Sequence, residues 1–141
     1  MNNNYHSALT FDYGLKQIGV AIGNRKFETT QALPIIRARD GIPNWDEIKK
    51  LIEEWKPDVL IVGLPLNMDG STSKMAERAS KFSRRLQGRF GLPVETVDER
   101  LSSQEAKSIL REQGHRGDFH RDPADSVAAQ LILQTWFEKS R

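Results

Sequence analysis

Two short apolar runs joined by a turn make up residues 8–23, which read ALTFDYGLKQIGVAIG. The runs at residues 8–11 and 18–22 flank Asp12-Tyr-Gly14, and this arrangement predicts a β-hairpin. Further along the chain, residues 59–62 are apolar without alternation, which is typical of a strand buried on both faces. A hairpin followed by alternating helices and strands predicts an α/β domain built on a mixed sheet.

The remaining elements are predicted from hydrophobic periodicity and from residues that begin or end helices and strands. Asn44 with Glu47 three residues later is a capping box, and Pro57 ends the helix that follows. Pro34 indicates that the strand around it lies at an edge or contains a bulge. We expect one domain over residues 1–141, with about five strands flanked by helices. Helices are expected at residues 45–56, 72–89, 102–113 and 123–137, and strands also at residues 33–36 and 94–97.

The composition excludes several classes of protein. The 141 residues are 38% hydrophobic and 28% charged and contain no cysteine, so disulfides, thiol nucleophiles and Cys-ligated zinc are excluded. No apolar run approaches the roughly 20 residues of a membrane helix, and the N-terminus lacks the pattern of a signal peptide. We therefore expect a cytoplasmic protein without a membrane segment. A net charge of +2 is too small to indicate nucleic-acid binding, which only clustered charge could do.

Asp12 is the first candidate functional residue, because it ends the first predicted strand. Its carboxylate would project into a turn that Gly14 leaves open to the close approach of a backbone or a phosphate. The alternative is an ordinary Asp-x-Gly turn, since both residues are common in turns.

A pair of acids, Asp98 and Glu99, closes the last predicted strand and is followed by Arg100. Strand alternation sends the two carboxylates to opposite sides, so at most one of them faces a shared site directly. The alternative is a solvated loop in which an acid pairs with Arg100.

Asp125 is the third candidate acid and lies on the last predicted helix, on the face that should pack against the sheet. A carboxylate on that face would be desolvated unless it has a partner, such as a metal ion. The alternative is that Asp125, in the first turn, only interacts favourably with the helix dipole. The residues that share this face are Ala128, Ala129, Ile132 and Trp136.

The predicted helix at residues 72–89 carries two stripes at helical spacing. Its apolar stripe comprises Met75, Ala79, Phe82, Leu86 and Phe90. Its basic stripe, one residue earlier at each step, comprises Lys74, Arg78, Lys81, Arg85 and Arg89. Because Glu77 is the only acid on this helix, the basic stripe is a candidate phosphate-binding surface. The alternative is a solvated helix face.

The loop at residues 63–70 follows a strand predicted to be buried. Ligand-binding loops of α/β sheets lie at the carboxyl ends of such strands. The loop has no Gly-Lys-Ser/Thr sequence, so it is not a P-loop.

Four segments together resemble the YqgF (RuvX) family of bacterial nucleases. The resemblance extends over residues 8–137 and implies an RNase H-like fold. It also implies that the catalytic acids are Asp12, Glu99 and Asp125, with Glu99 rather than Asp98 taken from the pair. One departure is residues 114–122, a segment that is often strongly basic in the family and here mixes basic with acidic residues. The matching segments are residues 8–23, 61–70, 97–103 and 125–129.

The resemblance implies a metal-dependent endonuclease for structured nucleic acid, with the 5′ end of pre-16S ribosomal RNA as the expected substrate. Asp12, Glu99 and Asp125 would hold Mg²⁺ or Mn²⁺, whose charge relieves the repulsion among the carboxylates. Lys16 and Arg100 are candidates to hold the scissile phosphate. The residues assigned to binding the flanking nucleic acid are Asn67, Lys74, Arg78, Lys81 and Arg85.

Two other functions stay open at this point: a deoxyribonuclease that resolves Holliday junctions, and a non-catalytic nucleic-acid-binding module. A four-way DNA junction favours two copies of an enzyme, because two symmetric cuts need two sites, whereas a ribosomal RNA precursor does not demand this. The expected partners are nucleic acid and ribosomal particles, and the expected state is a monomer or a weak homodimer.

Overall fold

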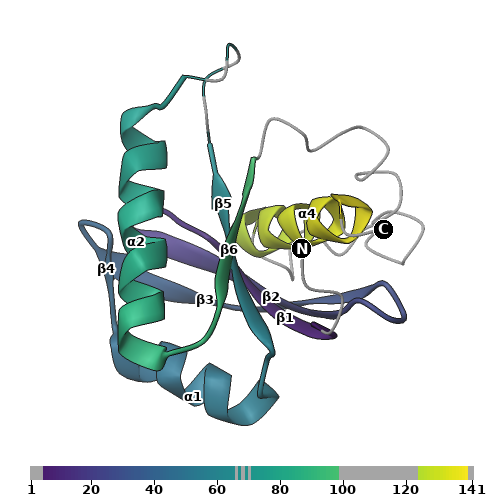
Figure 1. Cartoon of the computed structure of the whole chain (residues 1–141). Helices are drawn as coiled ribbons and strands as arrows, with labels where there is room; N and C mark the ends of the chain where they lie inside the picture. The colour runs from purple at the N-terminus through teal and green to yellow at the C-terminus, as the bar shows by residue number, and fades with distance from the viewer. Residues whose placement is uncertain (1–4, 66, 68, 70, 99–123, 140–141) are drawn as a thin grey trace.

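The computed structural model describes residues 5–65, 67, 69, 71–98 and 124–139 (Figure 1). The strands in this part of the chain are β1 (Ser7–Asp12), β2 (Gln17–Asn24), β3 (Thr29–Arg39), β4 (Ile42–Pro43), β5 (Val59–Leu64) and β6 (Val94–Asp98). The helices are α1 (Trp45–Trp55), α2 (Lys74–Phe90) and α4 (Ala124–Lys139). The helix predicted at residues 102–113 lies outside the described residues.

The strands form one mixed sheet in the order β4-β3-β2-β1-β5-β6. Strands β1, β2 and β3 are antiparallel neighbours, whereas β5 is parallel to β1 and β6 is parallel to β5. The prediction of an α/β fold with a mixed sheet flanked by helices is confirmed.

The prediction of about five strands is wrong by one, because β4 is too short to show a pattern in the sequence. It forms by pairing with the end of β3, where Ala38 lies opposite Pro43 and Arg39 opposite Ile42. Strand β3 is also longer than the predicted residues 33–36. Exposed and partly buried residues alternate along its first half, so its apolar signal is weak there.

Pro34 lies at a bulge, as predicted. Leu33 pairs with Val20 and Ile36 with Ile18, so β3 has one more residue than β2 over this stretch. Because β4 pairs with only the last two residues of β3, Pro34 also lies where the sheet has an open edge. The missing N–H of proline therefore removes no hydrogen bond from the ladder on that side.

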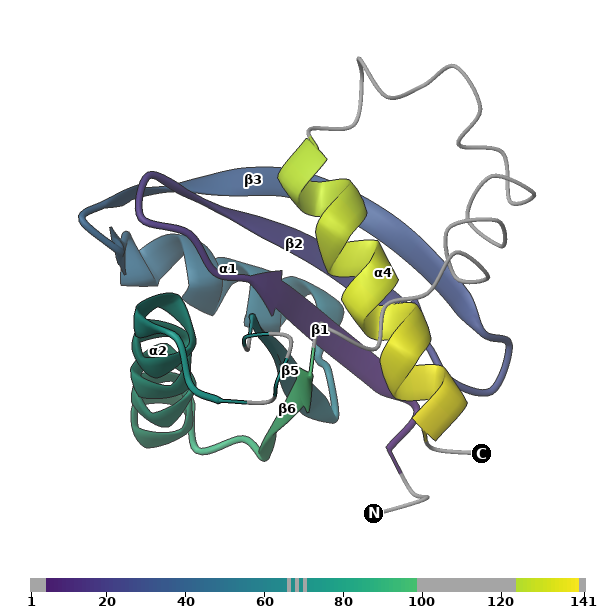
Figure 2. The ribbon, with the colours of Figure 1, turned by 90° about the horizontal axis from the view of Figure 1, so that it is seen from above.

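The sheet separates two hydrophobic cores. Helices α1 and α2 cover one face, and α4 crosses the other face diagonally (Figure 2). Leu9 and Phe11 of β1 contribute to the first core and Ala8 to the second, as strand alternation requires. Residues 59–62 are fully buried, which confirms the predicted buried strand. No helix in the described ranges is long and apolar enough to cross a bilayer.

Polar residues define where the first two helices begin. The side chain of Asn44, the predicted N-cap of α1, accepts a hydrogen bond of 3.0 Å from the backbone N–H of Asp46. Helix α2 begins two residues later than predicted, because Ser73 is its N-cap and accepts from the N–H of Ala76. Its far end is a left-handed C-cap at Gly91.

Asp58 ties the chain before β5 to the start of β1. Its Oδ2 accepts hydrogen bonds from the backbone N–H groups of His6 and Ser7, at 2.9 and 3.0 Å. Its own N–H donates to the carbonyl of Ser7 at 2.8 Å. The two bonds to the carboxylate lower the pKa of Asp58.

We expect Asp58→Asn to lower the free energy of unfolding by about 1 kcal/mol at neutral pH, since a charged acceptor is lost at an exposed site. Because the folded-state pKa is lowered, this stabilisation is present above the ordinary pKa and is lost as the pH falls through the folded-state value. Urea unfolding at neutral pH and at about pH 3 measures the difference. Glu54→Gln, at an exposed acid of α1, is the matched control, and a pH-independent difference for Asp58→Asn would contradict the assignment.

Candidate functional site

Asp12 lies at the edge of the sheet where three parallel strands end. It is the last residue of β1, and the register places Phe11 beside Val62 of β5 and Leu64 beside Asp98 of β6. The carboxyl ends of β1, β5 and β6 therefore meet at one edge, which is where α/β sheets bind ligands.

Strand alternation decides the face on which Asp12 lies. Ala8 belongs to the core under α4, and Thr10, two residues further, is fully buried. Leu9 and Phe11 belong to the other core, beside α1 and α2. Asp12 therefore continues the row of Ala8 and Thr10 on the α4 side, and it is half-buried there.

Helix α4 begins at the same end of the sheet as Asp12. The hydroxyl of Ser126 is fully buried and donates a 2.7 Å hydrogen bond to the carbonyl of Leu33 in β3. Leu33 pairs with Val20, which pairs with Phe11, so the first turn of α4 lies level with the end of β1. Two strand spacings, roughly 10 Å, separate β3 from β1.

The backbone of Asp125 is therefore at the same edge, and on the same face of the sheet, as Asp12. It immediately precedes Ser126 in the first turn of α4. The side chain of Asp125 is outside the description, and so are the whole of Glu99 and Arg100. The role predicted for these three residues stays a prediction.

Asp98 lies on the opposite face from Asp12. Val97 packs in the core under α4, and the carboxylate of Glu95 accepts a 2.9 Å hydrogen bond from the indole Nε1 of Trp136 in that helix. Asp98, next to Val97, follows the alternate row and pairs with Leu64, which packs against the other core. The side chains of Asp98 and Asp12 therefore lie on opposite faces of the sheet.

The side chain of Asp12 is a suitable ligand for a hard divalent cation. Asp12 offers carboxylate oxygens, which Mg²⁺ and Mn²⁺ prefer to nitrogen or sulfur ligands. Among the described side chains there is no group of three or more residues that could hold a metal, and two of the three predicted ligands are not among them.

The basic stripe of α2 is exposed along its length, beside the stripe that buries Ala79, Phe82 and Leu86. On α2 itself the stripe carries only positive charge, but the turn between β3 and β4 presents an acid to it. Nη1 of Arg78 lies 3.5 Å from Oδ1 of Asp40. Sequence analysis missed Asp40, since nothing in the spacing of residues relates it to α2.

Arg89, at the last turn of α2, has a different partner. Its guanidinium lies 4.3 Å from the centroid of the Trp45 ring, at the start of α1. A cation over an aromatic face is attracted to it and loses part of its freedom to contact a ligand. The cations of the stripe that lie near Tyr13, in the turn after β1, are Arg78, Lys81 and Arg85.

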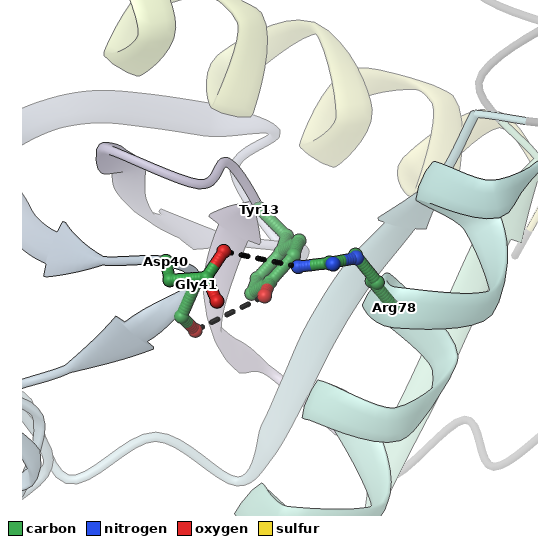
Figure 3. Close-up of polar contacts among 4 residues, drawn as sticks. All are labelled: Tyr13, Asp40, Gly41 and Arg78. Carbon is green, nitrogen blue, oxygen red and sulfur yellow. Dashed lines mark hydrogen bonds and ion pairs between the residues drawn. The ribbon is translucent and has the colours of Figure 1, made fainter.

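A pocket of about 340 Å³ lies where α2 meets two turns of the sheet (Figure 3). Arg78, Lys81 and Arg85 line it from α2. Tyr13, from the turn after β1, and Asp40, from the turn between β3 and β4, line the other side. The Tyr13 ring also packs on Phe82, with 5.0 Å between ring centroids.

The β3–β4 turn is clamped to the turn after β1. The Tyr13 hydroxyl donates a 3.0 Å hydrogen bond to the carbonyl of Gly41 (Figure 3). The N–H of Gly41 donates to the carbonyl of Leu15 at 2.8 Å. Asp40 and Gly41 both have positive φ, of 50° and 81°, as a two-residue type I′ hairpin turn requires. The Asp-Gly dipeptide is the sequence signal that could have revealed this turn.

Lys16 and Asn67 are both exposed. Lys16 lies in the turn between β1 and β2, at the same sheet edge as Asp12, and its carbonyl accepts from the N–H of Ala38 at 2.8 Å. The side-chain amide of Asn67 donates to the hydroxyl of Ser71 at 3.0 Å, which helps to close the loop between β5 and α2. The predicted role of either residue in binding is not tested by these contacts.

The fold is shared with solved Holliday junction resolvases. RuvC from T. thermophilus, in complex with a Holliday junction substrate, superimposes with a TM-score of 0.61 at 10% identity, over 96% of this chain and 95% of that chain. The fowlpox virus resolvase, in complex with Holliday junction DNA, superimposes with a TM-score of 0.58 at 15% identity, over 94% and 97% of the two chains. At these identities the similarity shows the fold, which is RNase H-like.

Sequence comparison identifies the family. A family model described as "RuvX: Holliday junction resolvase" matches residues 6–139, so this chain belongs to that family and the predicted resemblance is confirmed. A relative from Chromohalobacter salexigens is 56% identical over 92% of this chain and 87% of its own length. A relative from Saccharophagus degradans is 51% identical over 93% and 92%. Both are named "Putative pre-16S rRNA nuclease".

The clamp between Tyr13 and Gly41 predicts a non-additive pair of substitutions. A Cβ at residue 41 would overlap the Tyr13 hydroxyl and would also sit at a positive φ. Gly41→Ala should therefore destabilise the protein by about 1–3 kcal/mol, and Tyr13→Phe by about 1 kcal/mol through the lost hydrogen bond. Because Tyr13→Phe removes part of the clash, the double variant should lose less stability than the sum of the losses of the two single variants. Urea unfolding of the three variants measures this. Strict additivity would show that the two residues are not in contact.

Proposed function

We propose that this protein is a metal-dependent endonuclease that cleaves structured nucleic acid, with the 5′ end of pre-16S ribosomal RNA as its substrate. The observation that supports this most is the position of Asp12. It stands at the carboxyl edge of the sheet, on the face where the first turn of α4 brings the backbone of Asp125. Membership of the RuvX family and the names of its relatives support the same reaction.

In this proposal Asp12, Glu99 and Asp125 hold one or two divalent cations, Mg²⁺ or Mn²⁺. A bound divalent ion supplies activation of the attacking water and stabilisation of the leaving oxygen in phosphodiester hydrolysis. Lys16 and Arg100 orient the scissile phosphate by charge and hydrogen bonds. The exposed side chains of the basic stripe bind the flanking backbone, which positions the substrate without reading its bases.

Two observations bear on the substrate. The relatives at 51–56% identity carry a ribosomal RNA name, and this favours RNA processing in the cytoplasm, on or near ribosomal particles. The family description names Holliday junctions, and this supports junction DNA as the second candidate. A junction resolvase would act as a dimer, because two symmetric cuts need two sites, whereas an RNA nuclease can act as a monomer. Competition between an RNA precursor and a four-way DNA junction for cleavage distinguishes the two.

Asp12→Asn should abolish cleavage that depends on Mg²⁺, with a rate loss of about 10²-fold or more, because a metal-binding carboxylate contributes several kcal/mol to the transition state. The measurement is single-turnover cleavage of a precursor RNA, with and without Mg²⁺. Thermal unfolding without metal is the control that the variant is folded. Wild-type protein that binds the RNA but never cleaves it would instead support the non-catalytic module.

The orientation of β6 predicts unequal roles for its two terminal acids. Glu99→Gln should reduce cleavage by several orders of magnitude, whereas Asp98→Asn should reduce it far less, because Asp98 follows the row of residues on the face away from Asp12. Parallel cleavage assays on the two variants test this. Equal or reversed losses would show that the acid pair acts from the opposite register.

A further inference from the structure

The pocket beside Tyr13 combines three cations with a single carboxylate. Arg78, Lys81 and Arg85 are exposed and line one side, and Asp40 lines the other. The local charge is therefore +3 from the cations and −1 from Asp40, an excess of two positive charges. An excess of positive charge in a concave site attracts an anion, and the carboxylate already present occupies only one of the three cations.

The pair between Asp40 and Arg78 is weak enough to be exchanged. The two charged groups are 3.5 Å apart, with side-chain exposures of 81% for Asp40 and 50% for Arg78. Ion pairs this exposed contribute little to stability, because water and salt screen them. A phosphate oxygen offers Arg78 a stronger, charge-assisted partner.

The backbone that carries Asp40 is nevertheless held in place by its turn. The type I′ backbone does not depend on the side chain of Asp40. Neither does the hydrogen bond of Gly41 with Tyr13 (Figure 3), nor that of Gly41 with Leu15. When Arg78 moves to another anion, the turn still presents the acid to the pocket. Asp40 therefore keeps a negative charge next to the pocket, and this charge opposes any anion that enters beside it.

We propose that this pocket binds one phosphodiester group of the substrate backbone, which takes the place of Asp40 on Arg78, and that Asp40 thereby limits the affinity for nucleic acid. This inference rests on the proposed function, since it assumes a nucleic-acid substrate. It adds a subsite on the α2 side of the sheet, whereas Asp12 faces the α4 side. Because Tyr13 lines the pocket and directly follows Asp12, a backbone bound there passes over the end of β1 next to the candidate active site.

The test uses Asp40→Asn in the full chain. Asparagine tolerates the positive φ, and Asn-Gly is a preferred type I′ sequence, so the turn should be kept while the charge is removed. Binding of a structured RNA and of a DNA junction is measured in Ca²⁺, which prevents cleavage. We expect affinity to rise about two- to five-fold, the effect of removing one exposed charge pair. Arg78→Gln should weaken binding and reduce the log–log salt slope by about 0.7–0.9, as for one lost phosphate contact.

The double variant tests whether Asp40 acts through Arg78. In the Arg78→Gln background, Asp40→Asn should raise the affinity for nucleic acid clearly less. The reason is that phosphate can no longer replace Asp40 as the partner of Arg78. Glu54→Gln on α1 makes the same change in net charge away from the pocket and should leave affinity unchanged. An equal gain for Glu54→Gln, an equal gain in both backgrounds, or no gain at all would overturn the inference.

These outcomes are separate from those that decide the proposed function. Wild-type protein that binds in Ca²⁺ but does not cleave in Mg²⁺ would overturn the nuclease and leave the phosphate pocket in place. Cleavage by wild type, with affinity insensitive to Asp40→Asn, would overturn the pocket and leave the nuclease. Wild-type protein that binds neither ligand would overturn both.

Discussion

Both faces of strand β1 are buried and must be covered by other elements, and the rest of the structure is arranged around this constraint. Leu9 and Phe11 pack in one hydrophobic core, and Ala8 packs in the other, on the face where Thr10 is also fully buried. Each large apolar side chain that is fully buried contributes about 1.5–3 kcal/mol, so neither face can be left to water. Helices α1 and α2 supply the first layer and α4 supplies the second. The structure therefore has three layers, with α1 and α2 on one face of the sheet and α4 on the other, because neither face of β1 is exposed to solvent.

The same constraint explains where polar chemistry is found. Along β1 no charged side chain is tolerated until the strand ends, and Asp12 is the first residue after the fully buried Phe11. Strands β5 and β6 end at the same edge, since they are parallel to β1, and α4 begins there because Ser126 bonds to Leu33. A carboxylate site at this edge therefore does not place a charge in either hydrophobic core. Its position outside the interior of the sheet makes the site compatible with a stable fold.

Helix α2 couples the core to the basic surface. Phe82 packs under Tyr13 on its inner side, and Arg78, one turn earlier, faces the β3–β4 turn. Because Tyr13 also bonds to Gly41, the aromatic contact, the hairpin turn and the charged pocket form one connected unit beside Asp12. Packing in the core therefore fixes the distance between the candidate active site and the basic stripe. Charge on α2 alone would not define that distance.

The sequence by itself determined the type and order of most elements, because periodicity, caps and prolines act locally. Residues 8–23 predicted the hairpin, Asn44 predicted the start of α1, and Pro34 predicted the bulge. The four family segments identified the RNase H-like fold, since their order and spacing are specific. Asp12 could be singled out because it directly follows a buried strand.

Only the tertiary structure decided which distant residues meet. Asp40 and Arg78 become neighbours through a two-residue strand, β4, that exists only by pairing and has no pattern of its own. Ser126 reaches Leu33 across 93 residues of chain. Alternation predicted that Asp98 and Glu99 diverge, but the packing of Val97 under α4 was needed to assign Asp98 to the face away from Asp12. Spacing along the chain carries no record of such contacts, because they depend on how the layers stack.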